Sequence, residues 1–291
     1  MDNLTNIGTI KDILSRHGFT FSKSLGQNFL INPSVCPKMA QNANIDENTG
    51  VIEIGPGIGV LTNELLKLSK KVVAIELDKR LIPVLDETLS EYSNLKIIND
   101  DVMKIDLKKL ISEEFEGMKV VVCANLPYYI TSPVIMRLLE EKLRISSITV
   151  MVQKEAALRL CADLGTRESS AVTVAVNYYS KPEFLFNVSS GSFMPAPRVD
   201  SAVIRLDIFD REQKPIDEKL FFKVVKGAFI QRRKTLSNSL SSYFKMDKTA
   251  IGEILNKAKL DTNIRAESLN IEDFILVSDL IYNYNKQNNQ I

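Results

Sequence analysis

The chain has 291 residues, of which 45% are hydrophobic and 25% charged, and its formal net charge is +1. This composition is that of an ordinary soluble globular protein, and the near-zero charge by itself argues for no polyanionic partner. No stretch approaches the ~20 apolar residues of a membrane span, and the polar N-terminus does not resemble a signal peptide, so we expect no membrane partner.

Cysteine and histidine are scarce. Cys36, Cys123 and Cys161 are isolated from one another, and His17 is the only histidine in the chain. The absence of a CxxC pair and of a histidine cluster argues against a metal site and against histidine-based acid–base catalysis. Unpaired thiols suit a reducing compartment, so we expect a cytoplasmic protein.

Strand and helix patterns alternate over most of the chain. A short helix over 7–16 and a second helix from Pro33 come first. Strand patterns then recur at 51–54, 71–77, 95–98, 118–124 and 145–152, followed by a pair at 183–188 and 199–209 that we expect to be antiparallel. Strands that alternate with helices of this length predict an α/β fold with a parallel, doubly wound, Rossmann-like sheet.

The pattern changes after Asp210, where only helical periodicity remains. We therefore expect two domains: 1–210, with an N-terminal lid over 1–45, and a smaller all-helical domain over 211–291. The second domain contains 14 Lys and Arg against 10 Asp and Glu, a balance of +4, which leaves −3 for residues 1–210. This asymmetry is a weak indication of a nucleic-acid-facing side.

A glycine-rich turn follows the first strand of the alternating run. Gly55, Gly57 and Gly59 have the spacing G-x-G-x-G, and Val60 stands where a dinucleotide fingerprint requires the third glycine. This spacing argues against an NAD-dependent oxidoreductase. Two acids come with the next strands. Glu76 ends the second strand, where it can accept hydrogen bonds from ribose hydroxyls, and Asp101, just past the third strand, can accept one from an adenine amine. Glycine turn and acids together are typical of class I S-adenosylmethionine-dependent methyltransferases.

Asn125, Leu126, Pro127 and Tyr128 come directly after an apolar strand, at the edge where open α/β sheets bind ligands. Pro127 biases Leu126 toward an extended conformation, so we expect backbone carbonyls here to face a cleft. The Asn125 amide oxygen and these carbonyls can accept from an exocyclic amine, and Tyr128 offers a stacking face. The arrangement suits a planar base taken out of its stack.

These motifs together resemble the ribosomal RNA adenine N6,N6-dimethyltransferase family over almost the whole chain. Residues 25–30 are similar to the family's cofactor lid, which implies cofactor contacts at Asn28 and Leu30. The N-L-P-Y tetrapeptide is similar to its catalytic motif. Residues 193–201 resemble its F-x-P-x-P-K-V-D-S segment, which implies that Phe193 lies across the target base from Tyr128. Arg198 stands where lysine is common, and Ala124 and Tyr129 flank the motif where relatives often have glycine and asparagine.

The resemblance implies that S-adenosylmethionine is the cofactor and that the substrate is 16S rRNA within an immature small ribosomal subunit. The modified groups would be the N6 amines of two adjacent adenosines in the 3′-terminal hairpin. We expect a monomer without a metal, with RNA contacts at the densest basic cluster of the helical domain: Lys226, Arg232, Arg233 and Lys234.

Three alternatives stay open. One is a large-subunit rRNA adenine N6-methyltransferase of the antibiotic-resistance type, and another is a ribosome-assembly factor whose catalysis is dispensable. A small-molecule methyltransferase would explain the glycine turn and Glu76, but it would not require Asn125–Tyr128, Phe193 and a basic helical tail. A solvated helix face is the competing interpretation of the basic cluster.

Overall fold

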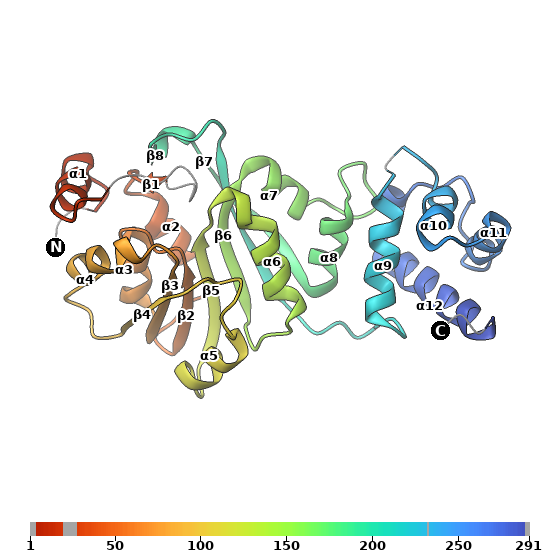
Figure 1. The fold of residues 1–291 in the computed structure, drawn as a ribbon, viewed down its shortest axis with the longest axis horizontal. Helices are drawn as coiled ribbons and strands as arrows, with labels where there is room; N and C mark the ends of the chain where they lie inside the picture. The colour runs from red at the N-terminus through yellow and green to blue at the C-terminus, as the bar shows by residue number, and fades with distance from the viewer. Residues whose placement is uncertain (1–3, 20–27, 232, 289–291) are drawn as a thin grey trace. The chain divides into compact units, whose positions relative to one another are not determined.

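The computed structural model describes residues 4–19, 28–231 and 233–288. Figure 1 follows the chain through its elements. The chain forms two compact units: residues 1–158 with 181–208, and residues 159–180 with 209–291. Within the described ranges, no helix is long and apolar enough to cross a membrane.

The first unit is built on a mixed sheet that has seven strands among the described residues, in the order β4-β3-β2-β5-β6-β9-β7. Neighbours from β4 to β6 run parallel, and β9 runs antiparallel to β6. The strand bounds are β2 Thr49–Ile54, β3 Lys71–Glu76, β4 Leu95–Asn99, β5 Lys119–Asn125, β6 Ser147–Gln153, β7 Ser180–Val188 and β9 Ser201–Ile208. The predicted α/β sheet is confirmed.

The central strands of this sheet are buried on both faces. The six residues of β2 are all buried, as expected for a central parallel strand. Val51 of β2 and its register partner Val121 of β5 lie on the same face of the sheet and belong to one buried cluster with Met39 of α2 and Leu65 of α3. The helix bounds in this unit are α1 Ile7–Arg16, α2 Val35–Gln41, α3 Val60–Leu68, α4 Ile82–Thr88, α5 Leu107–Glu114 and α6 Thr131–Glu140, and α7 Lys154–Leu160 crosses into the second unit.

A small two-stranded ribbon stands apart from the main sheet. Strand β1, Phe29–Leu30, pairs antiparallel with β8, Phe193–Met194. Leu30 lies opposite Phe193, and the Ile31 N–H extends the ladder by donating to the Ser192 carbonyl at 2.8 Å. The ribbon therefore joins two segments that are far apart in the sequence.

The second unit is helical and has its own core. Its helices are α8 Ala171–Tyr179, α9 Glu218–Phe229, α10 Leu236–Phe244, α11 Lys248–Lys257 and α12 Ile271–Gln287. Val174 and Tyr178 of α8 pack with Phe221 of α9 and Phe274 of α12. The expected boundary near 211 lies close to the crossing at 208–209, but residues 159–180 belong with the C-terminal helices because α8 buries its apolar side in their core.

Candidate active site

A cavity of about 300 Å³ opens at the carboxyl ends of β2, β3 and β5. Strand β2 has β3 on one side and β5 on the other, so the strand order reverses here, and open α/β sheets bind ligands at such a point. The cavity brings together most of the predicted site residues: Asn28, Leu30, Gly55, Gly57, Glu76, Asp101, Asn125, Leu126, Pro127, Tyr128 and Phe193.

The glycine turn lines one wall of this cavity with backbone. Gly57 has φ +62°, in the left-handed region that favours glycine, and an added Cβ would lie 3.4 Å from Cε1 of Phe29. Gly59, with φ +88°, is the N-cap of α3 and is absent from the described cavity wall. A Cβ there would lie only 3.0 Å from Cδ1 of Leu89. Gly59 therefore allows the start of α3 to pack closely against Leu89.

Glu76 ends β3 with its carboxylate held by backbone donors. The Asp78 N–H donates to Oε1 at 2.7 Å, and the Gly57 N–H donates to Oε2 at 3.3 Å. Burial raises the pKa of Glu76, and these N–H groups partly offset that effect. The acid and the glycine turn are thus fixed to each other, which places a carboxylate beside the turn as predicted.

Asp101 lies on the cavity wall but also holds its own loop. Its Oδ1 accepts from the Met103 N–H at 2.9 Å, and Lys104 Nζ lies 3.7 Å from its Oδ2. The neighbouring Val102 and Met103 add apolar surface to the wall. A flat ring with an amine at its edge fits this mixture of apolar and acceptor groups.

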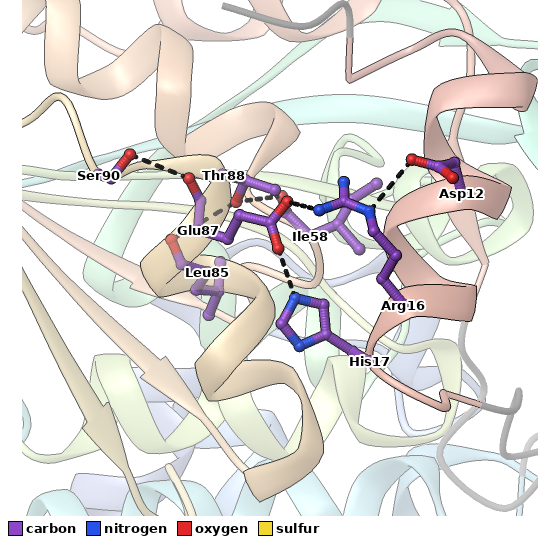
Figure 2. A network of polar contacts seen from close by, with 8 residues as sticks. All are labelled: Asp12, Arg16, His17, Ile58, Leu85, Glu87, Thr88 and Ser90. Atoms are coloured by element: carbon purple, nitrogen blue, oxygen red, sulfur yellow. Dashed lines mark hydrogen bonds and ion pairs between the residues drawn. The ribbon is translucent and has the colours of Figure 1, made fainter.

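Helix α1 is tied to α4 by charged side chains (Figure 2). Arg16 Nη1 lies 2.5 Å from Oε1 of Glu87, and His17 Nε2 lies 2.6 Å from Oε2. These contacts hold the pKa of Glu87 below its ordinary value. The adjacent Thr88 hydroxyl donates to the carbonyl of Ile58 in the glycine turn at 3.1 Å. His17 thus has a structural contact, and α1 is connected through α4 to the turn.

The N-terminal lid is only partly described. Residues 25–27, which complete the lid motif, lie outside the described residues. Asn28 and Leu30 lie within them and line the cavity. Leu30 is buried and fixed by the ribbon opposite Phe193, so the end of the lid segment is held beside the predicted base-stacking residue.

Asn125 ends β5, and the next peptide is anchored to the neighbouring strand. The Leu126 N–H donates to the Met151 carbonyl at 3.2 Å, which fixes the backbone on either side of the Asn125 carbonyl. The Pro127 carbonyl accepts from the Ile130 N–H at 3.1 Å. The expectation that the backbone carbonyls here face a cleft is therefore wrong for Pro127, because a 3₁₀ turn over Tyr128–Ile130 uses its carbonyl.

Tyr128 and Phe193 line the same cavity, as do the aromatic residues Phe29 and Tyr129. Tyr128 is half-buried, and its phenol oxygen lies 2.7 Å from Oγ of Ser201. Burial raises the pKa of Tyr128. Phe193 is buried on β8. Tyr128 and Phe193 thus line one cavity, and their placement on either side of a target base stays a prediction.

Glu53 is a cavity residue that the motif contains but to which sequence reasoning gave no role. Its side chain is 1% exposed, and its Oε2 has no hydrogen-bond partner within the described part of the chain. Burial and, to a lesser extent, the nearby Glu76 carboxyl raise its pKa to about 8. A carboxyl within the otherwise apolar strand V-I-E-I was the available signal, because buried acids are rare unless they bind something.

The predicted RNA-binding cluster lies in the second unit. Lys226 on α9 and Arg233 and Lys234 after it are exposed, and no ion pair to an acid is found for these three among the described residues. Arg232 lies outside the described residues. Unpaired surface cations are suited to phosphate contacts.

Comparison with known proteins decides the family. The model of the family described as ribosomal RNA adenine dimethylase matches residues 18–282. The chain belongs to this family. Among its relatives, a protein named ribosomal RNA small subunit methyltransferase A from Alkaliphilus oremlandii is 47% identical over 283 residues, 96% of this chain and 99% of the relative. The protein of the same name from Bacillus mycoides is 47% identical over 289 residues, 97% of this chain and 98% of its own.

Solved structures agree with this membership. A dimethyladenosine transferase from Plasmodium falciparum superposes with a TM-score of 0.73 at 28% identity, and the match covers 89% of this chain and 98% of that transferase. The 23S rRNA methyltransferase ErmE superposes with a TM-score of 0.66 at 25% identity, covering 88% and 100%. The fold is therefore that of the class I methyltransferases, and the resemblance to the dimethyltransferase family is confirmed.

Proposed function

We propose that this protein transfers methyl groups from S-adenosylmethionine to the exocyclic N6 of two adjacent adenosines in the 3′-terminal hairpin of 16S rRNA, giving N6,N6-dimethyladenosine during small-subunit biogenesis. The observation that carries the proposal is that Asn125, Tyr128 and Phe193 line one cavity with the glycine turn and Glu76. The relatives at 47% identity are named for the small subunit, which favours this RNA over the large-subunit RNA in the name of the 25% identical ErmE.

The cavity residues fit S-adenosylmethionine. Glu76 would accept from the ribose hydroxyls, Asp101 from the adenine amine, and the backbone at Gly55 and Gly57 leaves room that a side chain would fill. The unpartnered Oε2 of Glu53, buried in the same cavity, suits a group that donates hydrogen bonds. Asn28 and Leu30 would close the site from the lid segment. When bound, the cofactor supplies an electrophilic methyl group on its sulfonium.

The chain's own residues would position the target amine. The Asn125 amide oxygen and the Leu126 carbonyl would accept the two N6 hydrogens and turn the nitrogen lone pair, otherwise delocalised into the ring, toward the methyl carbon. Tyr128 and Phe193 would hold the base between their rings, each stack contributing about 1–3 kcal/mol. No basic side chain has to remove a proton before attack, which agrees with the absence of a second histidine.

The same proposal includes the surroundings in which the enzyme works. Its substrate particle would be an immature small ribosomal subunit, its compartment the cytoplasm, and its active form a monomer without a metal. Lys226, Arg232, Arg233 and Lys234 would contact RNA phosphates. The three that the structure describes are exposed and unpaired with acids, which supports that role.

The test is methyl transfer from radiolabelled S-adenosylmethionine to under-methylated 30S and 50S particles in parallel, followed by nucleoside analysis. The proposal expects label in N6,N6-dimethyladenosine on the 30S particle alone. Label on 50S RNA would instead support the resistance-type enzyme. If neither particle is labelled although cofactor binding is confirmed, the proposed reaction is wrong, and the result supports a ribosome-assembly factor whose catalysis is dispensable.

A further inference from the structure

Ser201 is a fully buried residue whose hydroxyl reaches the cavity wall. It opens β9, and its Oγ lies 2.7 Å from the phenol oxygen of Tyr128. Either oxygen can donate this hydrogen bond. Ser201 itself is not among the residues that line the cavity, so it would not touch the base or the cofactor directly.

The backbone around Ser201 is fixed on both sides. Ser201 pairs with Gln153 in the antiparallel ladder of β6 and β9. The preceding Asp200 accepts twice: its Oδ1 from the Ser190 N–H at 2.9 Å, and its carbonyl from the Lys154 N–H at 3.0 Å. The Ser201 hydroxyl therefore extends from a rigid support.

Tyr128, by contrast, stands on a 3₁₀ turn of only three residues, Tyr128–Ile130, and its side chain is only half-buried. Rotation about its side-chain torsions would change the orientation of the ring, and stacking on a base depends on that orientation. A hydrogen bond from the rigid strand to the phenol selects one orientation.

The stretch 193–201 connects this contact with the second ring. Phe193 begins the stretch on β8, where it pairs with Leu30, and Ser201 ends it at Tyr128. The two rings that are proposed to stack on the base, Tyr128 and Phe193, are thus both placed by one segment of chain.

We propose that Ser201 is a positioning residue for methyl transfer, which holds the Tyr128 ring in the orientation that stacks the target base. This inference rests on the proposed function. Loss of the hydroxyl would leave the cofactor residues in place and reduce the fraction of bound RNA whose base is correctly clamped.

The experiment measures single-turnover methyl transfer to under-methylated 30S particles, together with S-adenosylhomocysteine affinity, for Ser201→Ala, Tyr128→Phe and the double variant. Each single variant should lower the rate about tenfold, the scale of one hydrogen bond, with cofactor affinity within about twofold of the wild type. The double variant should be no slower than either single variant, because both changes remove the same contact.

Ser147→Ala is the matched control. Ser147 is a buried serine on β6 of the same sheet, and its Oγ has no hydrogen-bond partner in the described structure, so its removal should leave the rate unchanged. The inference would be overturned if Ser201→Ala transferred methyl groups as fast as Ser147→Ala. It would also be overturned if the rate of the double variant fell by the product of the two single-variant effects. If Ser201→Ala does not fold, Tyr128→Phe alone decides the test, because a methyl-transfer rate unchanged by Tyr128→Phe would contradict the positioning role of Ser201. An inactive wild type would instead reject the proposed function.

Discussion

The Gly57 N–H donates to Oε2 of Glu76 across 3.3 Å, so the glycine turn of β2 and the acid of β3 are held as one unit. The same carboxylate accepts from the Asp78 N–H through its other oxygen. Glu76 therefore has two tasks, one in binding and one in shaping the turn, and variants can separate them.

Glu76→Ala should weaken S-adenosylhomocysteine binding by about 10–100-fold, the scale of one or two lost hydrogen bonds to a charged group. It should also lower the melting temperature, because the buried N–H groups of Gly57 and Asp78 lose their acceptor. Glu76→Gln keeps one acceptor oxygen and should fall between the wild type and Glu76→Ala in both calorimetric titration and thermal unfolding. Equal cofactor affinity for all three proteins would remove Glu76 from the binding site.

Asn125→Ala should lower the rate of methyl transfer at saturating cofactor by about 10²–10³-fold, because the variant loses a positioned acceptor for the target amine. Cofactor affinity should stay within a few-fold of the wild type. The control is Asn187→Ala, an exposed asparagine on β7 outside the cavity wall. Weak cofactor binding with a normal rate at saturation would contradict the assigned role.

Glu53→Gln should change how stability depends on pH. The folded protein keeps the Glu53 proton up to a pKa of about 8, whereas the unfolded chain releases it near pH 4.3. The folded state thus binds more protons between these values, and its stability falls as pH rises through this window, by a few kcal/mol at most.

Glutamine cannot lose a proton, so the Glu53→Gln protein should show a flatter stability profile from pH 5 to 8 and be the more stable protein at pH 8. Urea unfolding at several pH values measures this difference. Glu116→Gln makes the same charge change at an exposed position and should keep the wild-type slope. Parallel profiles for the Glu53→Gln and wild-type proteins would mean that Glu53 is ionised when buried.

Gly59→Ala should destabilise the fold by about 2–3 kcal/mol, through left-handed backbone strain and the 3.0 Å approach of the new Cβ to Leu89. Gly117→Ala is the matched control: Gly117 has φ +70° but nothing within 4 Å of an added Cβ, so it should lose only about 1 kcal/mol for the strain. Equal losses in chemical denaturation would show that packing against Leu89 contributes nothing.

If the basic cluster contacts RNA phosphates, RNA binding should depend on salt concentration through these residues. Replacing Lys226, Arg233 and Lys234 by alanine should weaken binding to 30S particles and reduce the slope of log K against log salt by roughly two to three. A control protein loses the same number of charges from exposed lysines elsewhere in the second unit: Lys248, Lys257 and Lys286. If both triple variants change the slope equally, the cluster is an ordinary solvated surface.

The sheet and the cofactor wall could be predicted because their signals are local. Apolar runs mark the strands. Gly57 follows the end of β2 and Glu76 is the last residue of β3, and a parallel sheet must bring these two strand ends to one edge. The ribbon of Phe29–Leu30 with Phe193–Met194 has strands of two residues, too short to show a period, and its partners lie more than 160 residues apart.

Contacts that depend on how distant strands and helices pair could not be predicted from the sequence either. Ser201 reaches Tyr128 only because β9 lies antiparallel to β6, and no spacing in the sequence reveals that proximity. The apolar residues of α8 indicate that it is buried, but not that it joins the core of the C-terminal helices. The Pro127 carbonyl was assigned to the cleft because proline disfavours a helix, but a single 3₁₀ turn was enough to use it.

The β1–β8 ribbon also sets an order for events during synthesis. Strands β2 to β6 can pair as soon as residue 153 has left the ribosome, yet Phe193 and Ser201 are still to be made. The cavity therefore lacks the Phe193 ring until about two thirds of the chain has emerged, and the nascent enzyme cannot clamp a base between two rings before that point. A protein proposed to modify ribosomes would thus be unable to act during the first two thirds of its own synthesis.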